Sequence, residues 1–151
     1  MKKLYVITAS LMVLPAISAV AANPNPAFKQ RHQNFEAMGK AMKGIFDEFK
    51  KPAASLAKVR ANSAVLAQSA QKVGGHFPKG TGPGAGVKTE ALPAIWEKPA
   101  EFKAATDRLV TATAGLQAAA ASGDMAKIKA AAGAVGGSCK GCHDSFRKPK
   151  D

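Results

Sequence analysis

The sequence predicts an all-α protein, an antiparallel four-helix bundle with one longer Gly/Pro-rich crossover loop. Apolar residues recur in steps of three and four over most of residues 28–146, which is typical of amphipathic helices, and alternating strand-like runs are almost absent. Glycine, proline and capping residues divide this pattern into four segments. Two of the connections are short and one is long, which suits a helical bundle.

The first predicted helix runs from Phe28 to Phe49, and the second begins at Pro52, a residue suited to the first helical position. Gly74 and Gly75 end the second helix. The apolar seams of these two helices contain Phe28, Arg31, Phe35, Met38, Met42, Ile45 and Phe49, and then Leu56, Val59, Ser63, Leu66, Ala70 and Val73.

A connection rich in glycine and proline follows, from Gly74 to about Pro99. Its residues 80–86 cannot form regular secondary structure. They lack the Gly-Lys-Ser/Thr ending of a phosphate-binding loop, so we expect a plain crossover. This segment carries the only tryptophan of the chain, Trp96, which we expect to pack against the core or against a cofactor.

The third helix opens at Pro99 and ends at Ser122 and Gly123, and Asp124 is a suitable N-cap for the last helix. The two cysteines of the chain lie in phase with the apolar seam of that last helix, so we expect them to face the core. The seam contains Met125, Ile128, Ala132, Val135, Cys139, Cys142 and Phe146.

Residues 139–143 read Cys-Lys-Gly-Cys-His, the C-x-x-C-H pattern of covalent c-type haem attachment. Two thiols at this spacing can each add to one of the two vinyl groups of a haem. The imidazole of His143 then lies beneath the iron as its proximal ligand. The pattern therefore predicts one haem c, fastened to the core-facing stripe of the last helix.

Other uses of two cysteines fit less well. A thioredoxin-like pair usually lies at the start of a helix in a βαβ unit, and a structural zinc site needs four ligands. The only histidines besides His143 are His32 and His76. A disulfide between Cys139 and Cys142 remains as an alternative, although it does not account for His143.

The N-terminal residues resemble a secretory signal peptide, with Lys2 and Lys3, an apolar stretch over residues 4–17 and small residues before Ala21. The apolar stretch is short for a membrane span of roughly 20 residues. We expect residues 1–21 to be removed, after Ala21 or Ala22, and no stable membrane insertion afterwards. Residues 22–151 then form one haem-binding bundle in the periplasm, because bacteria attach haem c outside the cytoplasm.

The chain is strongly basic, and loss of Lys2 and Lys3 with the leader would reduce its formal net charge from +12 to +10. A positive surface suits an acidic redox partner. Nucleic-acid binding is not indicated, because the chain has no basic-aromatic run and no recognition motif.

Three stretches resemble the cytochrome c′ family, and the resemblance covers the whole mature chain. They are residues 136–147 with the Cys-x-x-Cys-His run, Ile95-Trp96 followed by Phe102-Lys103, and Arg31-x-x-x-Phe35-x-x-Met38-Gly39-x-x-Met42.

This resemblance implies roles for individual residues. Cys139 and Cys142 would form the thioethers, and His143 would be the proximal ligand of a five-coordinate, high-spin iron. Arg147 matches the family arginine near the proximal face. Arg31 matches the arginine that pairs with a haem propionate, the alternative being a solvated surface charge.

The residue over the distal face decides the expected function. In cytochromes c′ an apolar side chain four residues after that arginine covers the iron, whereas low-spin relatives carry a methionine there. This chain has Phe35, which has no donor atom. The resemblance therefore implies binding of NO and CO, in NO sequestration or protection. It does not imply an enzyme, because a peroxidase needs a distal acid–base group.

Two alternatives at the distal face stay open. Met38 lies almost one turn from Phe35, and as sixth ligand it would make the protein a low-spin electron-transfer cytochrome. His32 is a further candidate ligand, whereas we expect His76, in the loop, to be solvated. The resemblance also implies a homodimer formed through the first two helices.

Overall fold

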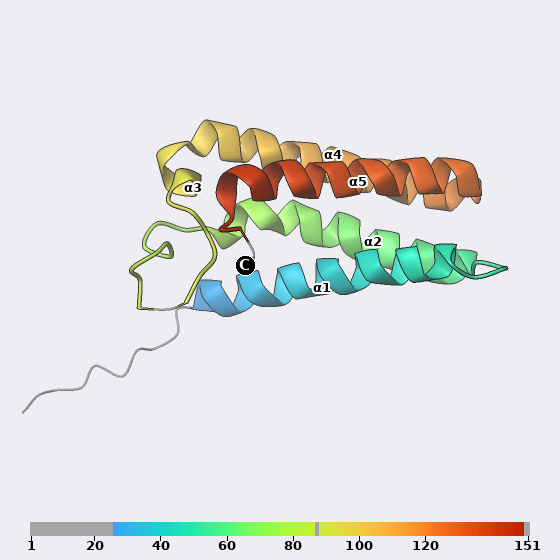
Figure 1. The fold of residues 1–151 in the computed structure, drawn as a ribbon, viewed down its shortest axis with the longest axis horizontal. Helices are drawn as coiled ribbons and strands as arrows, with labels where there is room; N and C mark the ends of the chain where they lie inside the picture. The colour runs from blue at the N-terminus through green and yellow to red at the C-terminus, as the bar shows by residue number, and fades with distance from the viewer. Residues whose placement is uncertain (1–25, 87, 150–151) are drawn as a thin grey trace, which may run out of the picture.

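The protein is described here by a computed structural model that covers residues 26–86 and 88–149 (Figure 1). The predicted signal peptide, residues 1–21, lies outside these described residues. The helices are α1 (Pro26–Phe49), α2 (Leu56–Lys72), the 3₁₀ helix η1 (Val73–His76), α3 (Ala94–Glu97), α4 (Pro99–Ser122) and α5 (Met125–Phe146).

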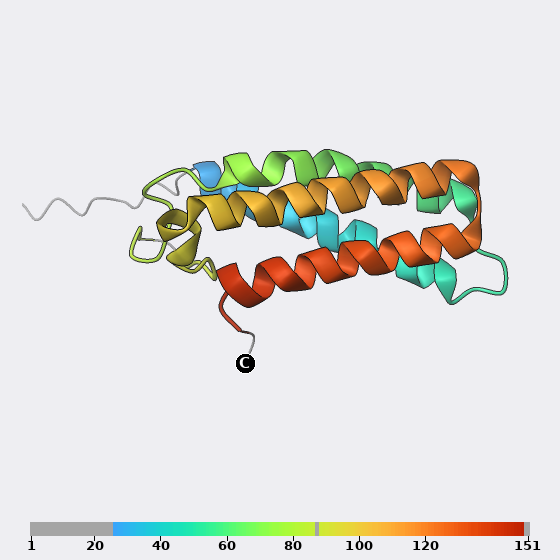
Figure 2. The ribbon, with the colours of Figure 1, turned by 90° about the horizontal axis from the view of Figure 1, so that it is seen from above.

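The four long helices form the predicted bundle (Figures 1 and 2). Around the bundle α1 packs on α2, α2 on α4 and α4 on α5, whereas the remaining neighbours, α1 and α5, make few contacts with each other. The start of α1, the end of α5, η1 and α3 all lie at one end, which we call the crossover end. The connections at residues 50–55 and 123–124 lie at the other end.

Two hydrophobic clusters fill the bundle. The larger one runs along all four long helices, and its fully buried side chains include Ile45, Val59, Leu66, Leu116, Ile128 and Val135. The smaller one lies at the crossover end and consists of Ala91, Ile95, Phe102, Ala105 and Phe146. The second cluster joins α3, α4 and the end of α5, so it holds the crossover against the bundle.

The boundaries of the last two long helices agree with the sequence. Pro99 is the first residue of α4, and Gly123 ends that helix in the left-handed conformation at φ 76°. Asp124 caps α5, because its side chain accepts hydrogen bonds from the amides of Ala126 and Lys127. These signals act within three residues, which is why the sequence alone located them.

The predicted start of the second helix at Pro52 is wrong, because α2 begins at Leu56. A helix starting at Pro52 would have Lys51 as its N-cap, and lysine has no acceptor for the free amides. Ser55 serves instead, since its hydroxyl accepts from the amide of Lys58. Its own amide donates to the carboxylate of Glu48 at 2.9 Å.

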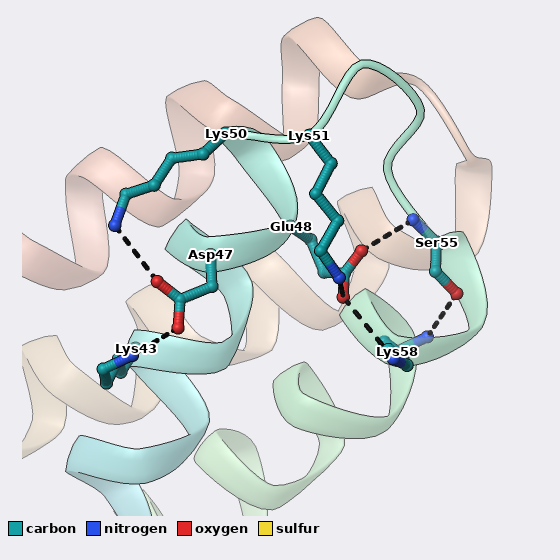
Figure 3. A network of polar contacts seen from close by, with 7 residues as sticks. All are labelled: Lys43, Asp47, Glu48, Lys50, Lys51, Ser55 and Lys58. Atoms are coloured by element: carbon teal, nitrogen blue, oxygen red, sulfur yellow. Dashed lines mark hydrogen bonds and ion pairs between the residues drawn. The ribbon is translucent and has the colours of Figure 1, made fainter.

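Glu48 is the centre of a polar network at the turn between α1 and α2 (Figure 3). Its side chain is almost fully buried, and its carboxylate accepts hydrogen bonds from Lys51 and from the Ser55 amide. These two bonds, with a smaller contribution from the charges of Lys51 and Lys58, hold the pKa of the carboxyl below its usual value. The neighbouring Asp47 pairs separately with Lys43 and Lys50.

The connection from Val73 to Lys98 is more ordered than expected, since it contains η1 and the short α3. Gly80, Gly84 and Gly86 have positive φ values of 78°, 84° and 75°, which fits the prediction that this stretch is irregular. We call residues 77–93 the crossover segment.

Gly82 permits a close approach within that segment. A Cβ built at Gly82 would lie 2.9 Å from Cζ3 of Trp96, so the backbone passes directly over the indole. The indole cannot easily move, because its Nε1 donates to the carbonyl oxygens of Phe77 and Pro78 at 3.1 and 3.2 Å.

We predict that Gly82→Ala lowers the free energy of unfolding by about 1–3 kcal/mol, because the added methyl group overpacks against Trp96. Gly115→Ala is the control. A Cβ at Gly115 in α4 meets nothing within 4 Å, so this change should stabilise the protein by about 0.5–1 kcal/mol. Chemical denaturation followed by circular dichroism measures both. A neutral Gly82→Ala would contradict the close contact.

We predict that the stabilising effect of Glu48 depends on pH. A carboxyl whose pKa is lowered on folding stabilises the native state above its unfolded pKa, and this contribution is lost as the pH falls through its folded pKa. The difference in unfolding free energy between wild type and Glu48→Gln should therefore shrink between neutral pH and about pH 3. Glu101→Gln, which changes an exposed residue, is the control. A difference that is constant with pH would refute the prediction.

Candidate haem site

The crossover end brings together the residues that the sequence singled out on two different helices. Arg31 and Phe35 lie in the N-terminal half of α1 and Met38 lies at its middle, and residues 139–143 lie in the C-terminal half of α5. The start of α1 and the end of α5 both lie at the crossover end (Figure 1). The predicted distal and proximal residues therefore lie toward the same end of the bundle.

The two cysteines are half-buried and free, so they are not joined in a disulfide. Cys139 packs against the larger hydrophobic cluster and Cys142 against the smaller one, so the motif spans the junction of the two. Burial raises the pKa of both thiols. His143 follows Cys142 and is exposed, and its carbonyl oxygen accepts from the amide of Arg147.

The glycines of α5 leave room around the motif. A Cβ built at Gly133, Gly136, Gly137 or Gly141 would meet no heavy atom within 4 Å. Close helix–helix packing therefore does not explain these glycines, although each weakens a helix by roughly 1 kcal/mol relative to alanine. A large flat group attached to the cysteines would have space to approach the backbone here.

Arg31 is buried, with 7% of its surface exposed, so the alternative of a solvated surface charge does not describe it. Its Nη1 and Nη2 donate to the carbonyl oxygen of Thr81 at 3.3 and 3.2 Å, and Nη2 also donates to the hydroxyl of Thr89. The guanidinium lies between the rings of Phe28 and Phe77, at 4.5 and 4.7 Å from their centroids.

This arginine has no carboxylate within ion-pair distance among the described residues. Burial accordingly lowers its pKa. A buried cation that is paired only with neutral acceptors is costly, so an anionic group beside Arg31 would be stabilised.

The other distal candidates occupy different environments. Met38 is buried in the larger cluster, with 6% of its surface exposed, and its Sδ lies 4.0 Å from Nδ2 of Asn34. Phe35 is half-buried, and its ring meets the ring of Phe77 edge-on at 6.2 Å. His32 is exposed.

The crossover segment ties the end of α5 to α1. Residues 90–92 pair with residues 146–148 through backbone hydrogen bonds and a short antiparallel bridge. Nε of Arg147 lies 3.2 Å from the Glu90 carboxylate, and Thr89 accepts from Arg31 of α1. The segment therefore joins the helix with the predicted distal residues to the helix with the predicted ligand.

The sequence did not single out Phe77, an aromatic residue at the centre of the contacts at this end. Phe77 meets Phe35, Trp96 and Phe102 edge-on, so it is the hub of the aromatic contacts at this end. An isolated aromatic residue in a polar loop was the available signal.

His76 was expected to be solvated, which is wrong. It is half-buried because η1 docks against the bundle, its Nε2 is buried without a hydrogen-bond partner, and burial lowers its pKa.

Trp96 and Cys142 each pack against the smaller hydrophobic cluster. Among the described residues no group of three or more His, Cys, Asp or Glu side chains could hold a metal ion by itself. The two free thiols, the adjacent imidazole, the space beside the glycines and the unpaired buried cation instead fit a covalently attached haem c.

Known proteins agree with this assignment. The chain is 47% identical to a cytochrome c′ of Rubrivivax gelatinosus over 93 residues, which cover 61% of this chain and 70% of that protein. The nitric oxide complex of a mutant cytochrome c′ from Alcaligenes xylosoxidans has a TM-score of 0.71 at 33% identity, covering 84% of this chain and 97% of that one. A cytochrome c′ with an unusual ligand-controlled dimer dissociation has a TM-score of 0.74 at 28% identity, covering 82% and 95%.

The sequence profile described as Cytochrome C' matches residues 26–147, which is the span from the first turn of α1 to the arginine that follows α5. With its four-helix bundle, its haem c motif and this match over nearly all the described residues, the chain belongs to the cytochrome c′ family.

Proposed function

We propose that this chain is a periplasmic haem protein with a five-coordinate, high-spin iron that binds NO and CO, in NO sequestration or protection, and is not an enzyme. When bound, haem c supplies an iron with one open coordination position. The observation that carries the proposal is the contrast on α1 between half-buried Phe35, which has no donor atom, and Met38, which is buried in the core.

The proximal side is assigned to α5. Cys139 and Cys142 hold the haem through thioether bonds, and His143 binds the iron. Their spacing of three and four residues places them on one side of the helix. Arg147 lies one turn further on, where the Glu90 carboxylate restrains its guanidinium.

Arg31 is assigned to a haem propionate. Its guanidinium is buried at the crossover end and has only neutral acceptors, so a carboxylate would supply the missing counter-charge. Trp96 is assigned to the periphery of the same site, because it packs in one cluster with Cys142.

The distal side is assigned to Phe35. A phenyl ring covers the iron without binding it and shields it from charged ligands, which leaves access to small uncharged diatomics. Met38 belongs to the core, where the Asn34 amide lies against its sulfur. His32 is exposed, and a peroxidase would need an acid–base group over the distal face.

A homodimer through α1 and α2 is also proposed. Among the described residues the exposed large hydrophobic side chains are Phe46 of α1 and Val65 of α2, with 43% and 40% of their surfaces exposed. A second copy packed against α1 and α2 would cover these two side chains. The related protein with a ligand-controlled dimer dissociation supports this assembly.

The periplasmic location rests on the signal peptide predicted for residues 1–21. Of the described helices, none is long and apolar enough to cross a membrane. The positive charge of the chain would also suit an acidic redox partner in that compartment.

We predict that the ferrous protein has a broad high-spin Soret band that sharpens on addition of CO, and that it binds NO tightly. Met38→Leu should leave these spectra unchanged, as should the control Met42→Leu, because neither sulfur binds the iron. The measurement is absorption spectroscopy of the purified holoprotein. Sharp low-spin bands that are insensitive to CO and are lost in Met38→Leu would instead make the protein an electron-transfer cytochrome.

We predict that Phe46→Lys and Val65→Lys convert the dimer to a monomer, because each places a charge in the apolar contact between the two copies. Ala114→Lys, on the exposed face of α4, is the control and should leave the dimer intact. Sedimentation velocity of the holoprotein measures the assembly. A monomeric wild type, or a dimer that tolerates both substitutions, would exclude this interface.

A further inference from the structure

A cavity of about 430 Å³ lies between η1, α3 and the start of α4. Of the predicted haem contacts only Trp96 lines it, so it is distinct from the site described above. Gly74, Lys79, Pro99 and Lys103 are exposed, which opens the cavity to solvent on one side. Its lining consists of Gly74, Phe77, Lys79, Ile95, Trp96, Pro99, Phe102, Lys103 and Thr106.

The wall of this cavity is shared with the haem site. Phe77 lines the cavity and also meets the ring of Phe35 at 6.2 Å. Phe102 lines it too, and lies 5.0 Å from Phe77 and 5.2 Å from Phe146 between ring centroids. We call Phe77 and Phe102 the aromatic wall. One layer of side chains therefore separates the cavity from Phe35, the residue assigned to the distal face.

The chemistry of the lining favours an uncharged, apolar occupant. The indole Nε1 of Trp96 is already bonded to the Phe77 and Pro78 carbonyl oxygens. The hydroxyl of Thr106 donates to the Lys103 carbonyl oxygen, and Nζ of Lys103 pairs with Asp107. Those polar groups are thus satisfied and Lys79 is exposed to solvent, so the inner part of the lining is mainly aromatic and aliphatic. Enclosed apolar cavities bind small apolar guests such as xenon, and the aromatic inner wall of this cavity offers such guests the same kind of contact.

We propose that this cavity is an entry site for the gaseous ligand, and that Phe77 is the gate between it and the distal face. The proposal rests on the gas-binding function proposed above. An uncharged diatomic molecule concentrates in the apolar cavity and passes the edge of Phe77 to reach Phe35. Rotation of aromatic and neighbouring side chains opens such a path transiently.

An entry gate affects rates but not the equilibrium. A residue that obstructs the path slows association and dissociation by the same factor, because the free and bound states are unchanged. The expected signature of a filled cavity is therefore slower CO binding at an unaltered dissociation constant and an unaltered absorption spectrum.

Two adjacent glycines provide matched variants. Gly74 and Gly75 both lie in η1, both are exposed, neither has a positive φ, and a Cβ at either meets nothing within 4 Å. Only Gly74 lines the cavity. Gly74→Phe therefore fills the cavity, and Gly75→Phe adds the same side chain beside it.

The experiment measures CO rebinding to the ferrous holoprotein after flash photolysis. We expect Gly74→Phe to slow association and dissociation several-fold and equally, and Gly75→Phe to match the wild type. Xenon, as a second probe, should shift the NMR resonances of Trp96 and Phe77 in the wild type and in Gly75→Phe, but not in Gly74→Phe.

Contrary results separate the two proposals. Unchanged CO rates in Gly74→Phe, or a changed dissociation constant, would overturn the entry role while gas binding itself stands. Failure of xenon to perturb Trp96 and Phe77 in the wild type would overturn the docking site. A wild-type protein that binds no CO would overturn the proposed function, and the entry role with it.

Discussion

The crossover end of this bundle depends on one buried cation. Arg31 is held between two aromatic rings and donates to Thr81 and Thr89, which lie 50 and 58 residues further along the chain. Removing a guanidinium from water costs several kcal/mol unless its donors find acceptors. The crossover segment provides those acceptors. The same hydrogen bonds hold its glycine-rich backbone against α1. Arginine suits this role, since it stays charged when buried.

The same segment sets the spacing of the haem-bearing helices. Because α1 and α5 make few contacts with each other, direct packing between them does little to define the distance from Phe35 to the cysteines. Residues 89–92 bridge this edge of the bundle, bound to Arg31 on one side and to residues 146–148 on the other. The opposite end of the bundle is held independently by Glu48 and its lysines.

The aromatic wall connects the proposals made for this protein. Phe77 meets the residue assigned to the distal face, the guanidinium assigned to a propionate and the cavity assigned to gas entry. Its ring thus contacts two residues of α1 and lines the cavity between η1, α3 and α4. The glycine-rich loop is held against Trp96, because the indole Nε1 donates to the Phe77 carbonyl oxygen and the backbone at Gly82 passes directly over the indole.

Local signals in the sequence determined the helical class, the boundaries of α4 and α5, and the haem motif on the inner stripe of α5. Helix caps, a proline at the first helical position and apolar residues spaced three and four apart depend only on nearby residues. These features could therefore be predicted without the tertiary structure. The tertiary structure decided what depends on distant partners. The start of α2 at Leu56 depends on Glu48 across a turn, and the burial of His76 depends on docking of η1. The partners of Arg31 and the place of Phe77 follow from helix packing, because only the folded chain brings such separated residues together.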